Sequence, residues 1–433
     1  MTIATPFMPL WQAAGFTKET MIQEAVYQPL KQDLSVVGLA PTGSGKTLAF
    51  GLPLLEKLVP GDGLQLLILS PSQELAIQTR DVLMPYAKAI DLGLQGVTGS
   101  ANVKRQIEKL KAKPEVIVAT PGRFIELLTA NRIKLHDLQT IVVDEADELL
   151  RDPGLDQVRE IVMASPADVQ LGFFSATASP IMRELEQWFG QKPEWIDVRD
   201  QDHTQGEVTH YFIQSDRKHQ VDWLRRLAHI DKFQALVFFN QNASMEKAAA
   251  ILRHQAVKFG VLAKSGRQVA RQKALTDFRQ GKTTLLLVTD IAGRGLDIPK
   301  LPAVINFDVP KRHAAYIHRA GRTGRMGQPG LVITLGDDHD RRDMQKEFPE
   351  YVIKRGYMVD GKLQATPPTR EQREKSVEKP VVAAKSTPTQ RASRVDRPTA
   401  AKADTDKTPS KPHKKKRLRD QKNKGKRRQP TKK

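Results

Sequence analysis

The sequence contains no cysteine, which excludes disulfide bonds, thiolate zinc sites, iron–sulfur clusters and a cysteine nucleophile. It also lacks a basic region followed by an apolar stretch near its N-terminus, the pattern of a secretory signal. No apolar run reaches the roughly 18 residues that a membrane-spanning helix needs. We therefore expect a soluble, cytoplasmic protein. Its 433 residues are too many for one ordinary domain and predict two.

Aromatic residues are absent from the last 73 residues, where most of the positive charge lies. Residues 361–433 contain 24 Lys and Arg against 7 Asp and Glu, which accounts for +17 of the formal net charge of +20 and leaves +3 for residues 1–360. They also contain eight Pro and only six large aliphatic side chains. Such a segment cannot bury enough apolar area to offset its chain entropy. We predict a disordered basic C-terminal tail over residues 361–433.

Residues 1–360 alternate short apolar runs with longer amphipathic stretches, which is typical of a parallel sheet flanked by helices. Fully apolar runs of this length fit strands that are buried on both faces. The expected strands are Leu34–Leu39, Leu64–Ser70, Glu115–Thr120, Thr140–Asp144 and Val169–Ser175 in the first half, and Ala235–Asn240, Thr283–Asp290, Ala303–Phe307 and Gly330–Leu335 in the second.

A polar stretch, Val198–Glu207, separates the two sets of strands and predicts a linker. The expected fold class is therefore α/β, with two tandem parallel-sheet domains at residues 1–199 and 208–360. The linker covers residues 200–207, and the basic tail follows the second domain.

The strongest local signal is a glycine-rich loop between a predicted strand and an apolar stretch. Gly43 and Gly45 allow successive backbone N–H groups to turn onto a phosphate, and the next helix adds its N-terminal dipole. Lys46 would reach the β and γ phosphates, and the Thr47 hydroxyl would bind Mg²⁺. The predicted phosphate-binding loop comprises Ala40, Pro41, Thr42, Gly43, Ser44, Gly45, Lys46 and Thr47.

Three carboxylates at the end of the strand Thr140–Asp144 supply what a phosphate loop alone lacks, a metal ligand and a group that orients water. Asp144 can hold Mg²⁺ through water because hard cations prefer oxygen ligands. Glu145 could orient or deprotonate the attacking water. An acidic turn after a core strand would explain two carboxylates, but a third, Asp147, together with the phosphate loop, favours a nucleotide-hydrolysing site.

Residues 144–147 spell D-E-A-D, and the chain resembles the DEAD-box RNA helicases of helicase superfamily 2, in their bacterial form. The resemblance extends from about Gly15 to Gly330, with the motifs in order. It implies two RecA-like domains, ATP and Mg²⁺ as cofactors, and RNA as the partner. The implied activity is an RNA-stimulated ATPase that couples domain closure to local duplex unwinding or remodelling of RNA–protein complexes, in ribosome assembly among other contexts.

In the first domain the resemblance implies nucleotide recognition, coupling and RNA contact. Gln23 would read the adenine edge, and Phe16 would stack on the base. Ser175 and Thr177 would connect the ATP site to strand separation, with Asp147 as their partner. The residues expected to contact the RNA backbone are Pro71, Glu74, Thr120, Pro121, Gly122 and Arg123.

In the second domain the resemblance implies a complementary set. Gln268, Arg271 and Thr289 would contact RNA, Asp297 would contact the ribose, and His318 would join the coupling residues. Arg322 and Arg325 would act on the transferring phosphoryl group, because guanidinium groups suit its spread charge. Since both lie on the second domain, they would complete the ATP site only when the domains close.

Several positions depart from the family pattern. The family pattern has Arg where this chain has Gln73. The lost guanidinium predicts a modest loss of contact with the RNA backbone. Lys46, Asp144, Glu145 and both arginines are retained, so we expect an active ATPase. The departures are Glu19 and Met21 in place of two Pro, a short upstream segment with Phe7 and Trp11 as its candidate aromatics, Pro41 in place of Gln, Gln73 in place of Arg, Ser100 in place of Gly, and a short gap from Gly266 to Gln268.

The basic tail has three interpretations. Residues 411–433 contain 13 basic residues and one acidic residue, Asp420, so this segment could neutralise many phosphates as an auxiliary RNA tether without sequence preference. A solvated extension and a nuclear or nucleolar targeting signal are the alternatives.

Two other function classes remain open. A DNA helicase or translocase of the same superfamily would share the ATP chemistry, and a non-enzymatic RNA chaperone or scaffold would act mainly through the tail. No H-E-x-x-H pair occurs, so His203, His210 and His219 are expected at the surface or in the linker rather than around a metal ion.

Overall fold

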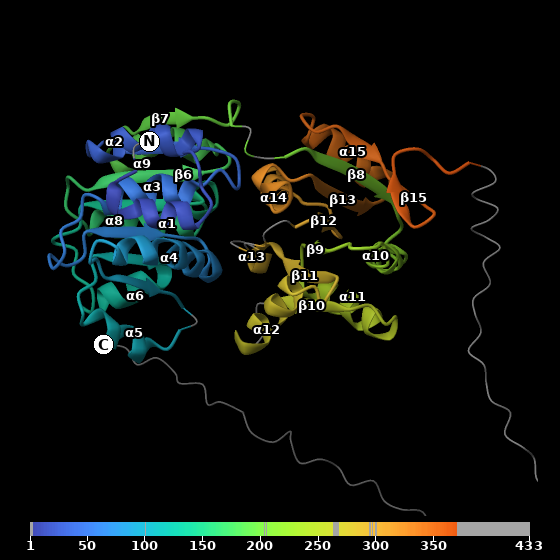
Figure 1. The fold of residues 1–433 in the computed structure, drawn as a ribbon, viewed down its shortest axis with the longest axis horizontal. Coiled ribbons are helices and arrows are strands. Elements are labelled where there is room, and N and C mark those ends of the chain that lie inside the picture. The colour runs from blue at the N-terminus through green and yellow to red at the C-terminus, as the bar shows by residue number, and fades with distance from the viewer. Residues whose placement is uncertain are drawn as a thin grey trace, which may run out of the picture. The chain divides into compact units, whose positions relative to one another are not determined.

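The computed structural model describes residues 3–99, 101–202, 204, 206–262, 268–293, 296, 298 and 301–369, all within one compact unit. They form two seven-stranded parallel sheets and one small antiparallel hairpin (Figure 1). Helices cover both faces of each sheet, which confirms the expected α/β class. Among the described residues, every helix is too short or too polar to cross a bilayer.

The first sheet has the strand order β3-β4-β2-β5-β6-β1-β7. Its strands are β1 (Val36–Leu39), β2 (Leu66–Leu69), β3 (Leu94–Val97), β4 (Val116–Ala119), β5 (Thr140–Asp144), β6 (Gln170–Ser175) and β7 (Glu194–Asp197). The helical elements around it are η1 (Thr5–Phe7), α1 (Met8–Ala13), α2 (Met21–Lys31), α3 (Lys46–Leu55), α4 (Gln73–Lys88), α5 (Val103–Leu110), α6 (Pro121–Thr129), α7 (Ala146–Leu149), α8 (Gly154–Met163), η2 (Pro180–Arg183) and α9 (Leu185–Phe189).

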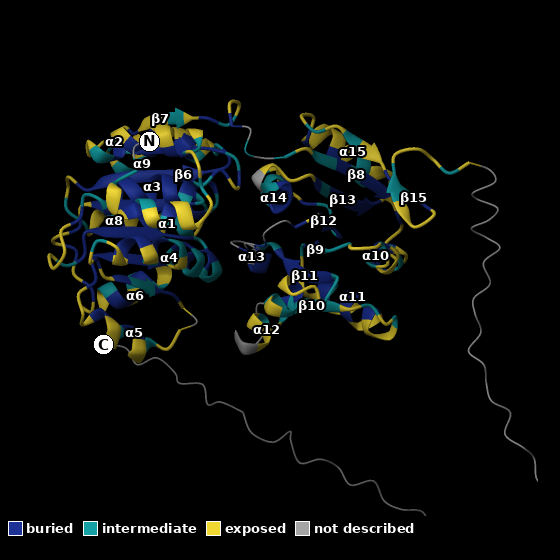
Figure 2. Ribbon diagram, viewed as in Figure 1, coloured by how far each residue is buried: buried dark blue, intermediate teal, exposed yellow. Residues whose placement is uncertain are grey.

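The central strands of this sheet are apolar throughout because both faces are buried (Figure 2). Successive side chains of a strand point to opposite faces. Ile68 and Val118 accordingly pack in one core cluster, and their neighbours Leu67 and Ile117 pack in the other. Polar side chains therefore collect at the strand ends, where the loops begin.

The second sheet has the strand order β10-β11-β9-β12-β13-β8-β14 and is built in the same way. Its strands are β8 (Val208–Gln214), β9 (Ala235–Phe239), β10 (Phe259–Leu262), β11 (Leu285–Thr289), β12 (Ala303–Asn306), β13 (Gly330–Gly336) and β14 (Ile353–Arg355). Its helical elements are α10 (Gln220–Ala228), α11 (Asn242–His254), α12 (Gln268–Arg279), α13 (Asp290–Gly293), α14 (His313–Ala320), η3 (Arg325–Gly327) and α15 (Asp338–Glu347).

All nine strands expected from apolar runs are present, with bounds that differ by at most two residues. Strands β3, β7, β8, β10 and β14 were not expected. Four of these five lie at the edges of the two sheets, where one side of a strand has no neighbour. Their burial is partial or alternating, so their sequences lack a continuous apolar run.

Part of the expected tail is folded. A turn at Asp360 and Gly361, both with positive φ, connects β15 (Tyr357–Val359) to β16 (Lys362–Gln364). Leu363 on β16 packs against the core of the second sheet beside Met358. The sequence interpretation missed this hairpin because a single apolar residue among polar neighbours gives no strand signal. Residues 370–433 of the expected tail lie outside the described residues.

His210 lies inside β8 and is 7% exposed, so the expectation that it would be a surface or linker residue was wrong. Its Nδ1 lies 2.6 Å from the hydroxyl of Tyr316 on α14. Burial raises the pKa of Tyr316, which keeps the hydroxyl protonated as a donor. Burial lowers the pKa of His210 to about 4, so the folded protein holds a neutral imidazole. His219, by contrast, is exposed, and His203 lies outside the described residues.

Neutral His210 makes folding stability depend on pH in a defined window. Because its pKa is near 4 in the folded chain and about 6.5 when unfolded, its contribution is complete above pH 6.5 and is lost as the pH falls toward 4. The free energy of unfolding, measured with urea, should fall by up to about 3 kcal/mol across this window. His210→Gln should reduce that slope, while His219→Gln should leave it unchanged. An equal slope in wild type and His210→Gln would contradict this assignment.

Candidate functional site

The predicted phosphate-binding loop connects β1 to α3. Gly43 and Gly45 have φ values of 90° and 83°, a region in which a Cβ atom is strained. Lys46 is 9% exposed, and its Nζ donates to the carbonyl oxygens of Ala40 at 2.8 Å and Pro41 at 2.9 Å. Burial lowers the pKa of Lys46, and the carboxylates of Glu145 and Asp144 oppose that effect. The loop therefore curls around its own lysine.

Gln23 and Thr20, at the start of α2, are hydrogen-bonded to the backbone of this loop. The Gln23 Oε1 accepts from the backbone N–H of Thr20 at 2.9 Å, and its Nε2 donates to the carbonyl of Gly45 at 3.3 Å. The Thr20 hydroxyl donates to the carbonyl of Ser44 at 2.8 Å. Sequence analysis singled out Gln23 but missed Thr20, although a Thr three residues before a Gln at a helix start is a capping-box signature.

Two of the three aromatic residues singled out near the N-terminus, Phe16 and Trp11, pack on one another. The rings of Phe16 and Trp11 are 4.8 Å apart between centroids, and Trp11 is 1% exposed. Phe7 is fully buried and makes an edge contact with Tyr86. Of the two candidate aromatics, Trp11 is therefore the one that contacts Phe16.

Asp144 and Glu145 stand at the carboxyl end of β5. Asp144 is 4% exposed, and burial together with the neighbouring Glu145 raises its pKa to about 7, against the opposing effect of Lys46. Glu145 has φ of +50° and donates its backbone N–H to Asp144 Oδ1 at 3.0 Å. This left-handed turn directs the two carboxylates into the site from adjacent positions.

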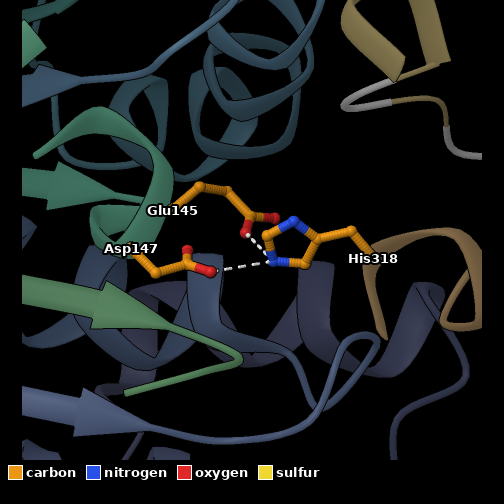
Figure 3. Close-up of side chains that lie close together, drawn as sticks. All are labelled: Glu145, Asp147 and His318. Carbon is orange, nitrogen blue, oxygen red and sulfur yellow. Dashed lines mark ion pairs between the residues drawn. The ribbon is translucent and has the colours of Figure 1, made fainter. Parts of the chain in front are cut away.

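Figure 3 shows the contact that joins the two halves of the site: His318 of α14 lies between Glu145 and Asp147. Its Nε2 is 3.3 Å from Glu145 Oε2 and 3.3 Å from Asp147 Oδ2. Burial opposes the charged imidazole, but Glu145 and Asp147 outweigh it and raise the pKa of His318. The trio therefore brings one imidazole and two carboxylates together within ion-pair distance.

The family resemblance implied that Asp147 would be the partner of Ser175 and Thr177, and Asp147 does contact Thr177. Asp147 is fully buried, and its Oδ2 accepts a short hydrogen bond from the Thr177 hydroxyl. The Thr177 N–H donates in turn to Ser175 Oγ at 3.0 Å. Burial alone would raise the pKa of Asp147, but the contacts with His318 and Thr177 lower it. The carboxylate is thus ionised and shared between the two halves.

The two expected arginines follow α14. Arg322 is 7% exposed, and its Nε donates to the carbonyl of His318 at 3.1 Å. The Arg325 Nε donates to the carbonyl of Gly321 at 3.0 Å. The side chain of Arg325 passes 3.4 Å from the position that a Cβ atom would occupy at Gly43, so it lies against the phosphate loop.

Arg319, between His318 and Arg322 in the sequence, was not predicted as a site residue. It is 1% exposed and makes five hydrogen bonds of 2.6 to 3.2 Å. The acceptors are both carboxylate oxygens of Asp290, the side chains of Asn240 and Asn306, and the carbonyl of Asp308. It thereby joins the ends of β9, β11 and β12 to α14. Its acceptors are dispersed over 69 residues of sequence, so no local pattern signals them.

The expected RNA-contacting residues of the first sheet lie at the carboxyl ends of β2 and β4. Thr120 precedes α6, Pro121 and Gly122 begin it, and Pro71 precedes α4. The Arg123 guanidinium donates to the carbonyls of Gly99 at 2.9 Å and Ala101 at 3.3 Å. These bonds fix the loop before α5 against α6.

Glu74 on α4 and Arg271 on α12 form a short ion pair, which brings together two expected RNA-contacting residues from different sheets. Thr289 ends β11 and is 8% exposed. Gln268 begins α12, and Asp297 and Gly266 lie outside the described residues. The amide nitrogen of Gln73 lies 3.0 Å from the position of a Cβ atom at Gly99, so Gln73 packs against the loop before α5.

The residues present fit a nucleoside triphosphate with Mg²⁺. The glycine cradle, the buried Lys46 and the buried Asp144 supply N–H donors, a cation and an oxygen ligand. The hydroxyl of Ser44 is buried and has no hydrogen-bond partner among the described residues. A polar atom of this kind inside a phosphate loop is what a bound phosphate would satisfy.

Comparison with known proteins gives a consistent result. The family model described as DEAD/DEAH box helicase matches residues 20–185, and the one described as helicase conserved C-terminal domain matches residues 219–327. The chain is 39% identical over 326 residues to the probable ATP-dependent RNA helicase YfmL of Bacillus subtilis, covering 75% of this chain and 86% of that one. It is 34% identical over 341 residues to the DEAD-box ATP-dependent RNA helicase CshC of Bacillus cereus, covering 78% and 87%.

Among solved structures, the chain is similar to Dbp5 of S. cerevisiae bound to RNA and ADP BeF3. The TM-score is 0.73 and the identity 27%, and the match covers 82% of this chain and 93% of Dbp5. A match of this extent includes both parallel sheets, which identifies them as tandem RecA-like domains.

Arg319→Lys should destabilise the protein strongly although the charge is kept. One ammonium has three donors and cannot reach acceptors that surround a planar guanidinium, so buried polar groups lose their partners. We expect a loss of about 3 kcal/mol or more in the free energy of unfolding, measured with urea. Arg253→Lys, on the exposed face of α11, is the matched control and should change it by less than about 0.5 kcal/mol. Equal effects of the two substitutions would contradict the structural role of Arg319.

Proposed function

Because this chain belongs to the DEAD-box family of ATP-dependent RNA helicases, we propose that its ATP binding and hydrolysis drive closure of the two domains on RNA, with local duplex unwinding or remodelling of RNA–protein complexes. The observation that supports this most directly is the His318 contact. A residue of the second domain bridges Glu145 and Asp147, which lie beside the phosphate loop of the first. The two halves of the site therefore depend on each other.

In the proposed mechanism the phosphate loop, residues 40–47, binds the triphosphate through its N–H groups. Lys46 now bonds to two neutral carbonyl oxygens, which are weak partners for a buried cation. The β and γ phosphates would replace them with charged oxygens. Thr47 and Asp144 would hold Mg²⁺, which neutralises phosphate charge. Gln23 and Phe16 would contact the adenine, and Asp297 the ribose.

Glu145 is the proposed group that orients and deprotonates the attacking water. Arg322 and Arg325 would stabilise the charge that spreads over the transferring phosphoryl group. Asp147, Ser175, Thr177 and His318 are proposed as the coupling group, because the loss of either half of that cluster leaves a buried charge without its partner.

RNA would lie across both domains at the proposed contacts Pro71, Glu74, Thr120, Pro121, Gly122, Arg123, Gln268, Arg271 and Thr289. Backbone and 2′-hydroxyl contacts would give sequence-tolerant binding with a preference for RNA. The RNA and ADP BeF3 bound by Dbp5 support this ligand pair. ATP and RNA would each favour the closed form, so each should tighten binding of the other.

We also propose the domain division at residues 1–199, 200–207 and 208–360, with the hairpin that ends at Gln364 added to the second domain. A cytoplasmic location, in line with the bacterial relatives, and a tail that acts as an RNA tether complete the proposal. A ribosomal or other RNA–protein assembly is the proposed context.

Glu145→Gln should lower the kcat of RNA-stimulated ATP hydrolysis by about 100-fold or more, because the amide cannot accept a proton. ATP binding should persist, since Lys46 and Asp144 are unchanged. Glu108→Gln, on the exposed face of α5, is the matched control and should retain full activity. The measurement is ATPase rate against RNA and against DNA of the same sequence. Equal stimulation by DNA, or none by RNA, would refute the proposed substrate.

Deleting residues 370–433 should raise the KM for RNA and leave kcat unchanged, because the deletion removes cations that neutralise phosphates but no group of the ATP site. The dependence of log KM on log salt should also become shallower. A matched full-length variant, with the basic residues of 411–433 replaced by Gln, separates charge from length. If KM is unchanged in both proteins, the tail is a solvated extension rather than a tether.

A further inference from the structure

The segment between the two sheets is hydrogen-bonded at both ends to parts of the proposed nucleotide site. At its start, the Val198 N–H donates to the carbonyl of Leu39 at 2.9 Å. Leu39 ends β1 and directly precedes the phosphate loop. Val198 is 7% exposed and packs in the core of the first sheet, so this end is anchored.

At its other end the segment joins the turn that carries Arg325. The Gly206 N–H donates to the carbonyl of Gly324 at 2.7 Å, and the Gly327 N–H donates to the carbonyl of Thr204 at 3.1 Å. One residue later, the carbonyl of Glu207 accepts from Gly330 at 2.9 Å. These bonds extend the pairing of β8 with β13 as far as this turn, residues 324–327, which we call the arginine turn.

The turn begins and ends at glycines with positive φ. Gly324 and Gly327 both have φ of +71°, and Arg325 stands between them. On one side, Thr323 is 1% exposed and donates to the carbonyl of Leu301 at 2.6 Å. On the other side, the backbone of residues 204 and 206 is hydrogen-bonded to Gly327 and Gly324. Without that backbone, the turn would lose the bonds to Gly324 and Gly327 that fix its two ends.

Gly206 is required at this position because of the close packing. A Cβ atom at residue 206 would lie 2.1 Å from the carbonyl oxygen of Gln328 and 2.7 Å from the carbonyl carbon of Gly327. Both are backbone atoms, which cannot rotate away as a flexible side chain could. Any side chain at residue 206 must therefore displace either the linker or the arginine turn.

We propose that the linker is a clasp that positions Arg325, with Gly206 as its critical positioning residue. The clasp comprises the backbone of residues 204, 206 and 207 bonded to Gly324, Gly327 and Gly330. Only eight residue steps separate Val198 from Gly206, so the two anchors can be at most roughly 28 Å apart. The same short segment thus limits how far the arginine turn can move from the phosphate loop and sets the orientation of the turn. This proposal rests on the proposed function, in which Arg325 acts on the γ-phosphate.

The test is the affinity of the full-length protein for ADP with beryllium fluoride, in the presence of Mg²⁺ and single-stranded RNA, compared with its affinity for ADP alone. Gly206→Ala should weaken binding of the beryllium fluoride complex by about 10- to 100-fold, because a displacement of about 1 Å in a catalytic group has effects of this size. Affinity for ADP alone should change by less than about twofold. The affinity for RNA without nucleotide should likewise stay near the wild-type value, while kcat falls.

Two controls separate positioning from a general loss of structure. Gly336→Ala places a Cβ atom 2.8 Å from Asp340 at the other end of β13, and it should leave the preference for the beryllium fluoride complex unchanged. In an Arg325→Ala background, Gly206→Ala should cause no further loss, because the group that it positions is already absent. A further loss of the same size in that background would overturn the clasp.

The outcomes distinguish the clasp from the proposed function. If wild type binds the beryllium fluoride complex no more tightly than ADP, the proposed function fails and the clasp fails with it. If wild type shows the preference and Gly206→Ala retains it, the clasp alone is wrong. If Gly206→Ala does not fold, insertion of one Gly after Gly206 shifts the hydrogen-bond register without a Cβ atom, and retention of the preference in that variant overturns the clasp.

Discussion

A parallel strand that is buried on both faces can present polar groups only at its ends, and this constraint organises the molecule. In the first sheet, β1, β2, β4, β5 and β6 each end directly before a segment of the candidate site. The phosphate loop, the loop with Pro71, the loop with Thr120, the carboxylates and the Ser175–Thr177 segment therefore meet at one edge of the sheet. The same rule places ligands of other open α/β sheets at the carboxyl ends of their strands.

Burial at that edge makes the charges of the site depend on one another. Lys46, Asp144, Asp147 and His318 are each largely removed from water, where an isolated charge would be very unfavourable. Each has a charged neighbour that offsets part of this cost. Burial still prevails at Lys46, whose pKa is lowered, and at Asp144, whose pKa is raised. The neighbours prevail at Asp147, whose pKa is lowered, and at His318, whose pKa is raised. A ligand that changes one charge must change the balance at the others. This is a physical basis for coupling between the nucleotide and the second domain.

Sequence reasoning found the interior of both sheets and most of the residues that the structure gathers at the candidate site, for identifiable reasons. Apolar runs reveal strands buried on both faces, and the phosphate loop and the carboxylates are short motifs of consecutive residues. The edge strands β3, β7, β10 and β14 escaped because partial burial leaves no continuous apolar run. The hairpin at residues 357–364 escaped because its second strand has a single apolar residue, Leu363, among polar neighbours and gives no strand signal.

The sequence by itself determined the class of fold, the candidate groups of the site and the split between a nearly neutral body and a basic tail, because these depend on residue type and local spacing. Only the tertiary structure decided which groups touch. Arg319 donates to five acceptors from distant segments, and His318 lies between two carboxylates. Gly206 packs closely against the arginine turn. The physical reason is that hydrogen bonds and close contacts between segments depend on distances of a few ångströms, which chain folding sets and residue order does not.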